Sequence, residues 1–504
     1  MSWRIAGLLF VVTLATRLPF ATTHLWGHDS VLYERAVTLF DPAAQSPQPP
    51  GYLWYVLLVR AVTAFTADAN AAMVLIAAIA GALAVALLYL LGARLFEERT
   101  ARAAAVLLLT AVTFWGEGAV AYPYTLLAAL STGCALLFWR ATGSGSERPL
   151  VAGHGSERPL VAARRGGRRL VLASLAWGIA VGFRTDLALF LAPLWLFAAY
   201  RVRSGVAAVA VAAAVVALAV GGWLAASAWA SPDAGAFVAA VAAQGRYVDE
   251  QYAVTGGGTA ALARNTYELA RYLGRGLLAI APLLGLLLIP AVARRALARD
   301  RATLFLALWT LAPLPVYLLV HVGEYGYVFS VLPGLSLLAA RGAAGAATAV
   351  RRPALLGWLA GAAVAVNAWL FLFSATPLGA ANLAKRDHAT PERLAALREL
   401  DPSCTLVVTG YDALLVDRYL RGSLAVLAYG PAETPTLARP LASALQRCRA
   451  GSATVVLWDD LLRAGVGDWA VATMPHGALL RTTVAPLGST LRIRDALTVD
   501  LSGP

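Results

Sequence analysis

The sequence predicts a mainly α-helical membrane protein with about eleven crossings, interfacial helices in its first external loop and a small external α/β domain at its C-terminus. Composition is the first observation, because 59% of the 504 residues are hydrophobic, only 14% are charged and the mean hydropathy is +0.67. The second observation is a set of long uncharged runs, and the third is the spacing of the arginines between these runs. Such a composition excludes an ordinary soluble protein.

Several uncharged runs are long enough to cross a hydrocarbon core of roughly 30 Å. They are residues 71–93, 206–230, 302–320 and 353–384. The first apolar stretch, residues 5–16, has the length of a secretory signal, but no small-residue cleavage site follows it and Arg17-Leu18-Pro19 interrupts it. We therefore expect a retained first helix.

The net charge of +13 comes almost entirely from arginine, with Lys385 as the only lysine. The arginines form clusters between apolar runs, which indicates membrane topology rather than nucleic-acid binding. The clusters lie at residues 94–102, 140–169, 201–203, 294–301 and 341–352. If all of them are cytoplasmic, the N-terminus is inside and the C-terminus is outside. We expect an integral protein of the bacterial inner membrane whose active site and C-terminal domain are extracytoplasmic.

The segments left on the external side contain many ionisable residues, which are costly near lipid and therefore indicate a site. These residues are His28, Asp29, Glu34, Glu117, Tyr122, Arg184, Asp186, Arg246, Asp249, Glu250, His321 and Glu324. We expect the acids Asp29, Glu117, Asp186 and Glu324 to converge on one cavity at the external face.

Two apolar runs are short, since residues 170–183 and 187–200 contain 14 residues each. The turn Arg184-Thr185-Asp186 between them is expected to be recessed into the outer leaflet, where polar backbone must line protein or a wet cavity. The alternative is a structural Arg–Asp pair that caps two short helices.

The first external loop begins with WGHDSVLYERAV at residues 26–37 and continues through a proline-rich stretch to the aromatic run at residues 53–58. Residues 31–40 also have one apolar face. We expect two helices that lie on the membrane, joined by a rigid turn.

Four short motifs resemble a known family. They are Asp29 with Tyr33, then Pro49-Pro50-Gly51-Tyr52, then Gly182-Phe183-Arg184-Thr185-Asp186, and finally Gly326-Tyr327 followed by Leu332-Pro333. Over about the first 340 residues the chain resembles the GT-C membrane glycosyltransferases, in the branch of the dolichyl-phosphate-mannose protein mannosyltransferases and the lipid A aminoarabinose transferase. Many of these relatives have an acidic pair where this chain has Asp29-Ser30. The role of the second acid would then be missing or would fall to Glu34 or Glu117.

The resemblance implies that a sugar moves from a polyprenyl-phosphate donor to an acceptor hydroxyl. A carboxylate can remove the acceptor's proton, and Asp29 is the candidate base; the alternative is that Asp29 caps a helix beginning near Ser30. The leaving phosphate needs positive or N–H partners. The candidates are Arg184, Arg246, His321 and Tyr325, although the tyrosines of residues 321–327 would also suit an aromatic belt. Supporting residues are Glu34, Glu117, Asp186 and Glu324 among the acids, and His28, Tyr33, Pro50 and Tyr52 in the loop.

No cofactor is expected to be required. A divalent metal on His24, His28 and Asp29 is an alternative, although their spacing specifies no metal geometry. The expected partners are the donor lipid, membrane lipid and a lipid, glycan or protein acceptor, without nucleic acid. Two other functions remain open: a lipid or solute transporter, which the lack of symmetry between the two halves disfavours, and a non-catalytic envelope assembly protein.

The chain divides into a membrane domain at residues 1–375 and an external domain at residues 376–504. In the external domain, residues 405–409, 424–429 and 454–458 are expected to be strands, and residues 413–420 and 437–448 helices, in a βαβαβ layer. Cys404 and Cys448 would then lie at one edge of the sheet and form a disulfide, whereas Cys134 is a buried apolar residue. Two separate thiols are the alternative. The repeat GSERPLVA, at residues 145–152 and 155–162, predicts a flexible loop.

Overall fold

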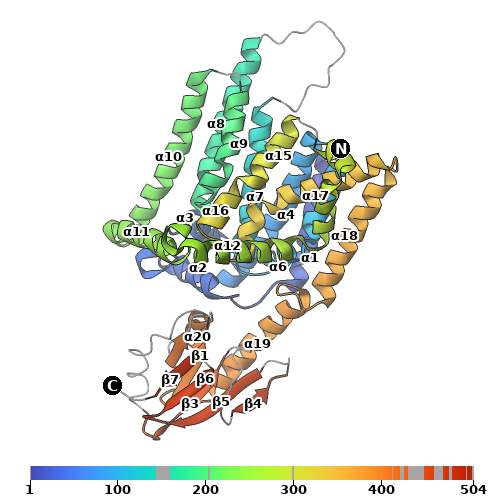
Figure 1. Ribbon diagram of the computed structural model, residues 1–504. Coiled ribbons are helices and arrows are strands. Elements are labelled where there is room, and N and C mark those ends of the chain that lie inside the picture. The colour runs from blue at the N-terminus through green and yellow to red at the C-terminus, as the bar shows by residue number, and fades with distance from the viewer. Residues whose placement is uncertain are drawn as a thin grey trace. The chain divides into compact units, whose positions relative to one another are not determined.

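The computed structural model describes residues 2–143, 159–202, 205–297, 300–410, 412–420, 425–428, 448–458, 469–475, 479–494 and 497–501 (Figure 1). The chain forms two compact units. The membrane unit consists of Met1–Ala21 and Arg35–Ala380, and the C-terminal unit consists of Thr22–Glu34 and Ala381–Pro504. A short piece of the first loop therefore belongs with the C-terminal residues.

The membrane unit is built of helices (Figure 1). Its longer helices are α1 (Ser2–Arg17), α3 (Leu53–Thr63), α4 (Ala69–Leu95), α5 (Glu98–Thr110), α7 (Tyr124–Ala141), α8 (Pro159–Phe183), α9 (Leu187–Arg201), α10 (Val206–Ala230), α11 (Ala234–Gln251), α12 (Val254–Leu277), α15 (Arg301–Leu311), α17 (Leu332–Ala349) and α18 (Ala354–Phe373). Shorter helices are α6 (Val112–Glu117), α13 (Ala281–Gly285), α14 (Pro290–Ala296) and α16 (Pro313–Leu319), with 3-10 turns η1 (Leu18–Phe20), η2 (Pro42–Ala44), η3 (Leu278–Ile280), η4 (Leu286–Leu288) and η5 (Tyr325–Ser330).

Within the described residues, seven helical segments are long and apolar enough to cross a membrane. They are Trp3–Phe20, Ala69–Leu95, Tyr124–Ala141, Val206–Ala230, Val254–Leu288, Arg301–Leu319 and Ala354–Phe373. The expected class of helical membrane protein is therefore confirmed, while the count of about eleven crossings stays a prediction.

The helices α4 and α7 form the centre of the membrane unit, because most residues of both are buried, whereas α10 is largely exposed. Small residues explain the close packing of α4. A Cβ at Gly92, for example, would lie 2.8 Å from a methyl carbon of Leu337 in α17. The exposed apolar surface of α10 is what a lipid-facing helix presents.

The prediction of two short helices is correct for only one of them. α9 is short, at 15 residues, but α8 has 25 residues and begins at Pro159. Arginine favours helix, so the arginine-rich residues 164–169 extend α8 beyond its apolar run. The first copy of the GSERPLVA repeat and the start of the second lie outside the described residues.

The first loop contains the two expected helices, α2 (His28–Thr38) and α3. α2 begins three residues earlier than expected, because Ser30 Oγ hydrogen-bonds to both the N–H and the carbonyl of Gly27 and ends the preceding turn. Between the helices the peptide bonds before Pro47 and Pro50 are cis. Gly51 has φ +105°, and a Cβ there would lie 2.7 Å from the Phe40 ring, so only glycine suits this turn.

Figure 1 shows α11 and α12 running across one end of the helix bundle, whereas α7, α8 and α10 run along it. Asp233 caps α11 by accepting a hydrogen bond from the N–H of Ala236. Within α12, Gly258 has φ +57° and kinks the helix. The glycine run at residues 256–258 is therefore part of a kinked helix.

In its described residues the C-terminal unit contains α19 (Ala380–Arg398), α20 (Ala413–Leu420) and seven strands: β1 (Thr405–Thr409), β2 (Ala425–Ala428), β3 (Ser452–Leu457), β4 (Ala470–Thr473), β5 (Leu479–Pro486), β6 (Thr490–Arg494) and β7 (Leu497–Asp500). β1 pairs in parallel with β2 and β3, and the sheet continues with antiparallel β5 and β4. β6 and β7 form a separate antiparallel pair. The expected parallel layer is present, but the four antiparallel strands were missed. The helix expected at residues 437–448 lies almost entirely outside the described residues.

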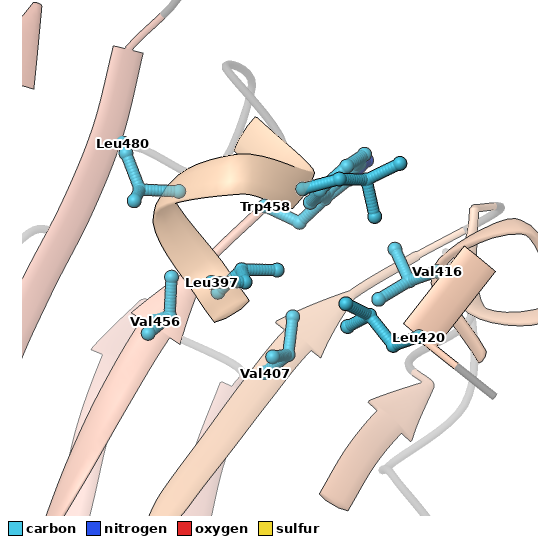
Figure 2. Packing of buried hydrophobic residues seen from close by; sticks show 8 residues of the cluster. Leu397, Val407, Val416, Leu420, Val456, Trp458 and Leu480 are labelled. Carbon is cyan, nitrogen blue, oxygen red and sulfur yellow. The ribbon is translucent and has the colours of Figure 1, made fainter. Parts of the chain in front are cut away.

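Alternate residues of β1 and β3 face two different cores, as the period of a strand requires. Figure 2 shows one core, where Val407 and Val456 pack against Leu397 of α19 and Val416 of α20. The other contains Leu406, Val408, Val455, Leu457 and Leu501. The sheet is therefore covered on both faces, and all five residues of β1 are buried.

The expected disulfide is confirmed. Cys404 directly precedes β1 and is bonded to Cys448, with a Cα–Cα distance of 4.8 Å. The pairing follows from the parallel register of β1 and β3, which brings the two strand starts together. Cys134 is buried and free, as expected.

Candidate functional site

Arg184 lies at the turn between α8 and α9 and is only 5% exposed. Its guanidinium donates to both carboxylate oxygens of Asp186, at 2.9 and 3.3 Å. Burial alone would lower the pKa of Arg184, but the Asp186 carboxylate and neighbouring tyrosine oxygens outweigh it and raise the pKa, so the side chain stays charged. The turn therefore contains an ion pair between a buried arginine and a partly buried aspartate.

Three tyrosine rings surround this guanidinium and form the tyrosine cage: Tyr52, Tyr124 and Tyr327, with ring centroids 5.8, 5.5 and 4.9 Å from Arg184 Cζ. They come from the N-terminal ends of α3 and α7 and from η5, so the cage joins three distant parts of the membrane unit. A cation near the faces of several aromatic rings is stabilised by their quadrupoles. Arg184 thus orders the expected loop residue Tyr52 as well as its own turn.

The segment from His321 to Tyr327 is held close to this cage. Tyr317 Oη donates to the carbonyl of Tyr327 at 2.6 Å, which fixes the start of η5. A Cβ at Gly326 would collide with the ring of Tyr124, so glycine is required for the close approach. The Gly-Tyr pair that we noted in the sequence therefore has a packing reason.

His321 is packed between aromatic rings, with Tyr252 at 4.3 Å and Tyr327 at 5.5 Å between centroids. Burial, together with the positive charges of Arg264 and Arg184, lowers the pKa of His321 to about 4. The imidazole is therefore neutral near neutral pH and adds no positive charge for a phosphate. Its Nδ1 is buried and has no hydrogen-bond partner among the described residues.

Two of the expected acids, Glu117 and Glu324, interact electrostatically although 207 positions separate them in the sequence. Glu117 ends α6 and is 2% exposed, and its Oε2 has no hydrogen-bond partner in the described part of the chain. Burial raises the pKa of Glu117 well above its usual value, and the negative charge of Glu324 raises it further. Glu117 is therefore suited to carry a proton near neutral pH.

The sequence reasoning missed three arginines on one face of α12. Arg264, Arg271 and Arg275 are spaced by seven and four residues, which places them on one side of a helix. Their guanidinium carbons lie over the rings of Tyr252, Tyr272 and Tyr325, at 5.0, 4.8 and 5.4 Å. Arg275 also donates a hydrogen bond to Tyr325 Oη. By contrast Arg246, a cation expected to bind the phosphate, is exposed on α11.

Arg275 borders a cavity of about 350 Å³. The other lining residues are Val112, Thr113, Leu278 and the segment 374–378. Among the described residues no carboxylate forms an ion pair with Arg275, and the buried Thr113 Oγ1 has no hydrogen-bond partner there. The cavity is thus lined by the half-buried Arg275 guanidinium, which has no carboxylate partner among the described residues, by the Thr113 hydroxyl, which has no hydrogen-bond partner there, and by apolar side chains.

Asp29 lies in the C-terminal unit, in the first turn of α2. The helix begins at His28 and Gly27 precedes it, so the alternative that Asp29 caps a helix near Ser30 is wrong. His28 and Asp29 are partly exposed, whereas Tyr33 is 2% exposed and belongs to the core. Glu34 forms an ion pair with Arg418 of α20, at 2.6 Å.

The metal alternative is not supported by the geometry. No group of three or more histidine, cysteine or acidic side chains that could hold a metal ion occurs among the described residues, which include His24, His28 and Asp29. His24 Nδ1 instead lies 3.4 Å from a carboxylate oxygen of Asp387.

The convergence of the four acids on one cavity stays a prediction. Within the membrane unit Glu117 interacts electrostatically with Glu324, and Asp186 forms an ion pair with Arg184 beside the tyrosine cage. Asp29 belongs to the C-terminal unit, and its convergence with the other three stays a prediction. Pro50 supports the cage only through the turn that presents Tyr52.

Residues 47–153 match the family model of the dolichyl-phosphate-mannose-protein mannosyltransferases. The whole chain also aligns with the crystal structure of ArnT from Cupriavidus metallidurans bound to undecaprenyl phosphate, with 16% identity, coverage of 100% of this chain and 98% of that chain, and a TM-score of 0.53. The predicted resemblance is confirmed. The chain has the ArnT fold.

Two further solved structures are similar. ArnT from Cupriavidus metallidurans in the apo state aligns with 15% identity over 95% of this chain and 97% of that chain, with a TM-score of 0.53. The oligosaccharyltransferase of Archaeoglobus fulgidus, in complex with Zn and sulfate, aligns with 14% identity over 95% of this chain and 72% of that chain, at a TM-score of 0.48. No curated protein matches the sequence.

Proposed function

We propose that the protein is a membrane glycosyltransferase that moves a sugar from a polyprenyl phosphate to an acceptor hydroxyl at the external face of the membrane. The observation that carries the proposal is the cavity bordered by Arg275, where a cation without an acid partner meets an orphaned hydroxyl and apolar walls. A lipid phosphate offers the complementary chemistry, namely a charged head and a hydrocarbon chain. The ArnT fold supports this reading, since the ArnT structure contains undecaprenyl phosphate.

The donor phosphate gains charge when its bond to the sugar breaks, so it needs donors that strengthen in the transition state. Arg275 supplies the charge in our proposal, Tyr325 orients it and Thr113 donates a hydrogen bond. Arg184 acts less directly, because Asp186 already neutralises it and its guanidinium holds the tyrosine cage. His321 contributes shape and at most a neutral hydrogen bond.

Asp29 is proposed as the general base. The acceptor oxygen attacks the anomeric carbon while the bond from that carbon to the phosphate oxygen breaks, and both electrons of this bond leave with the phosphate. The acceptor's proton passes to the Asp29 carboxylate. The products are the glycosylated acceptor and the free polyprenyl phosphate, and no metal or redox partner is needed for the balance.

The donor site is tested with Arg275→Ala, and Arg246→Ala is the matched control because Arg246 is an exposed arginine of the neighbouring α11. Loss of a charged hydrogen bond to the phosphate should weaken undecaprenyl phosphate binding roughly 10- to 100-fold. Binding would be measured on the full chain in lipid nanodiscs by displacement of a fluorescent polyprenyl phosphate. Equal affinities in Arg275→Ala and Arg246→Ala would remove Arg275 from the donor site.

The base is tested with Asp29→Asn, which keeps the shape of the side chain but removes its basicity. We expect kcat to fall roughly 10²- to 10⁴-fold with unchanged undecaprenyl phosphate affinity. Transfer would be followed with undecaprenyl-phosphate mannose and undecaprenyl-phosphate aminoarabinose as donors. If Asp29→Asn keeps its turnover, the base is another acid, and Glu34 is the next variant to compare.

A further inference from the structure

The segment Thr22–Glu34, here the base segment, folds with residues 381–504, although the helices of the membrane unit flank it in the sequence. It carries Asp29, for which the proposed function has a chemical role. The contacts that hold it come from α19 and α20, and residues that follow β1 and β3 hold one of the α19 side chains in turn.

The first anchor is Asp387 on α19. Its carboxylate accepts hydrogen bonds from Thr23 N–H at 2.8 Å, Thr23 Oγ1 at 2.9 Å and His24 N–H at 3.1 Å. Burial alone would raise the pKa of Asp387, but the hydrogen bonds from His24 and Thr23 outweigh it and hold the pKa below its usual value. The anchor therefore stays ionised, and intact, throughout the neutral range.

The second anchor lies at the other end of the base segment. Arg418 on α20 donates through Nε and Nη2 to the two oxygens of Glu34, at 2.9 and 2.6 Å. This bidentate geometry fixes the orientation of the Glu34 carboxylate as well as its distance from Arg418. The Arg418 side chain is 41% exposed, so the pair contributes little to stability, and its effect is on orientation.

A third set of contacts holds the middle. The guanidinium of Arg386 lies 4.8 Å from the Trp26 ring and also donates to Asp412 at 2.7 Å. Asp412 accepts a second hydrogen bond from Trp458 Nε1 at 3.2 Å. Asp412 and Trp458 follow the carboxyl ends of the parallel strands β1 and β3, so this contact is tied to the sheet itself.

We propose that the C-terminal unit positions Asp29 for catalysis, with Arg418 and Asp387 as positioning residues. The proposal rests on the proposed function, in which Asp29 is the base. Asp29 lies five residues after His24 and five before Glu34, so anchors on both sides fix the first turn of α2 and with it the direction of the carboxylate. A base displaced by about 1 Å can lose about 100-fold in rate, which gives such anchoring a catalytic value.

The experiment compares Arg418→Ala and Asp387→Ala with Arg398→Ala, an exposed arginine at the end of α19. All are made in the full chain in nanodiscs. Hydrogen exchange of residues 22–34 should accelerate about tenfold in the two anchor variants and stay unchanged in Arg398→Ala. Turnover with undecaprenyl-phosphate mannose or aminoarabinose should fall roughly 10- to 100-fold, while undecaprenyl phosphate affinity should change less than about twofold.

Exchange of the charges, Glu34→Arg with Arg418→Glu, should restore part of the turnover lost in Arg418→Ala, which a merely unfolded variant could not do. Unchanged exchange and unchanged turnover in both anchor variants would overturn the proposal. The variant Asp29→Asn distinguishes the positioning proposal from the proposal that Asp29 is the general base. If Asp29→Asn is inactive while Arg418→Ala has normal turnover, Asp29 remains the proposed base and the positioning role is wrong. If Asp29→Asn is active, Asp29 is not the base, and faster hydrogen exchange in the anchor variants then shows only that the C-terminal unit holds the base segment.

Discussion

Glu117 is a buried acid of the membrane unit whose ionisation should affect stability. Burial raises its pKa, and the charge of Glu324 raises it further, so the folded protein holds this proton more tightly than the unfolded chain does. Its contribution to stability is complete below the unfolded pKa of about 4.3 and is lost as the pH rises through the folded pKa.

Glu117→Gln removes this titration, so the variant should become more stable relative to the parent as the pH is raised from about 5 to about 9. The gain should be at most about 1.4 kcal/mol per pH unit. Thermal unfolding in detergent at a series of pH values measures it, with Glu250→Gln on the exposed part of α11 as the control. A difference between Glu117→Gln and the parent that is independent of pH would contradict the raised pKa.

At the same scale, sequence reasoning identified some residues of the site better than others. The Arg184–Asp186 pair could be predicted, because the two residues are neighbours and interrupt two apolar runs. Arg275 could not, since nothing local distinguishes it from Arg246. The two arginines differ in their tertiary contacts. Arg275 hydrogen-bonds to Tyr325 and borders a cavity, whereas Arg246 is exposed to solvent.

Among the elements, α12 has a helical pattern that its sequence contains but that a search for apolar runs does not reveal. No helix was predicted from its residues, although the arginine spacing of seven and four is helical. Counting matches to a helical period would have found this face, although not that Arg275 borders a cavity. The same helix also explains how an arginine-rich face can lie beside the His321–Tyr327 segment, because α12 contacts both α16 and η5.

The strands of the C-terminal unit show a different limit. β1 and β3 are buried on both faces and are therefore rich in valine and leucine, which made them visible in the sequence. β4 is exposed along its whole length, and β5 mixes threonine and arginine with leucine. Strands at or near an edge carry a weaker hydrophobic pattern, so the parallel half of the sheet was predictable and the antiparallel half was not.

At the scale of the whole molecule, the division into units could not be predicted from local patterns. The boundary expected near residue 375 separates the helices from the sheet, but Thr22–Glu34 joins the C-terminal unit through tertiary contacts with Asp387, Arg386 and Arg418. The Cys404–Cys448 disulfide was predictable, because it follows from strand pairing and compartment. The disulfide also gives the C-terminal unit an expected location, since such bonds persist in oxidising compartments.

The expected location of the C-terminal unit in an oxidising compartment and the positions of the arginine clusters predict the same membrane topology. Positive clusters are retained in the cytoplasm, so residues near Val350 should be inside, whereas Ala67 and Ala234 should be outside. Single cysteines at these three exposed positions would be made in a chain that lacks its native cysteines. A membrane-impermeant maleimide added to intact cells should label Ala67→Cys and Ala234→Cys, and should label Val350→Cys only after lysis. The reverse pattern would place the arginine clusters outside and exclude an external active site, while labelling of all three in intact cells would show that the membrane barrier was lost.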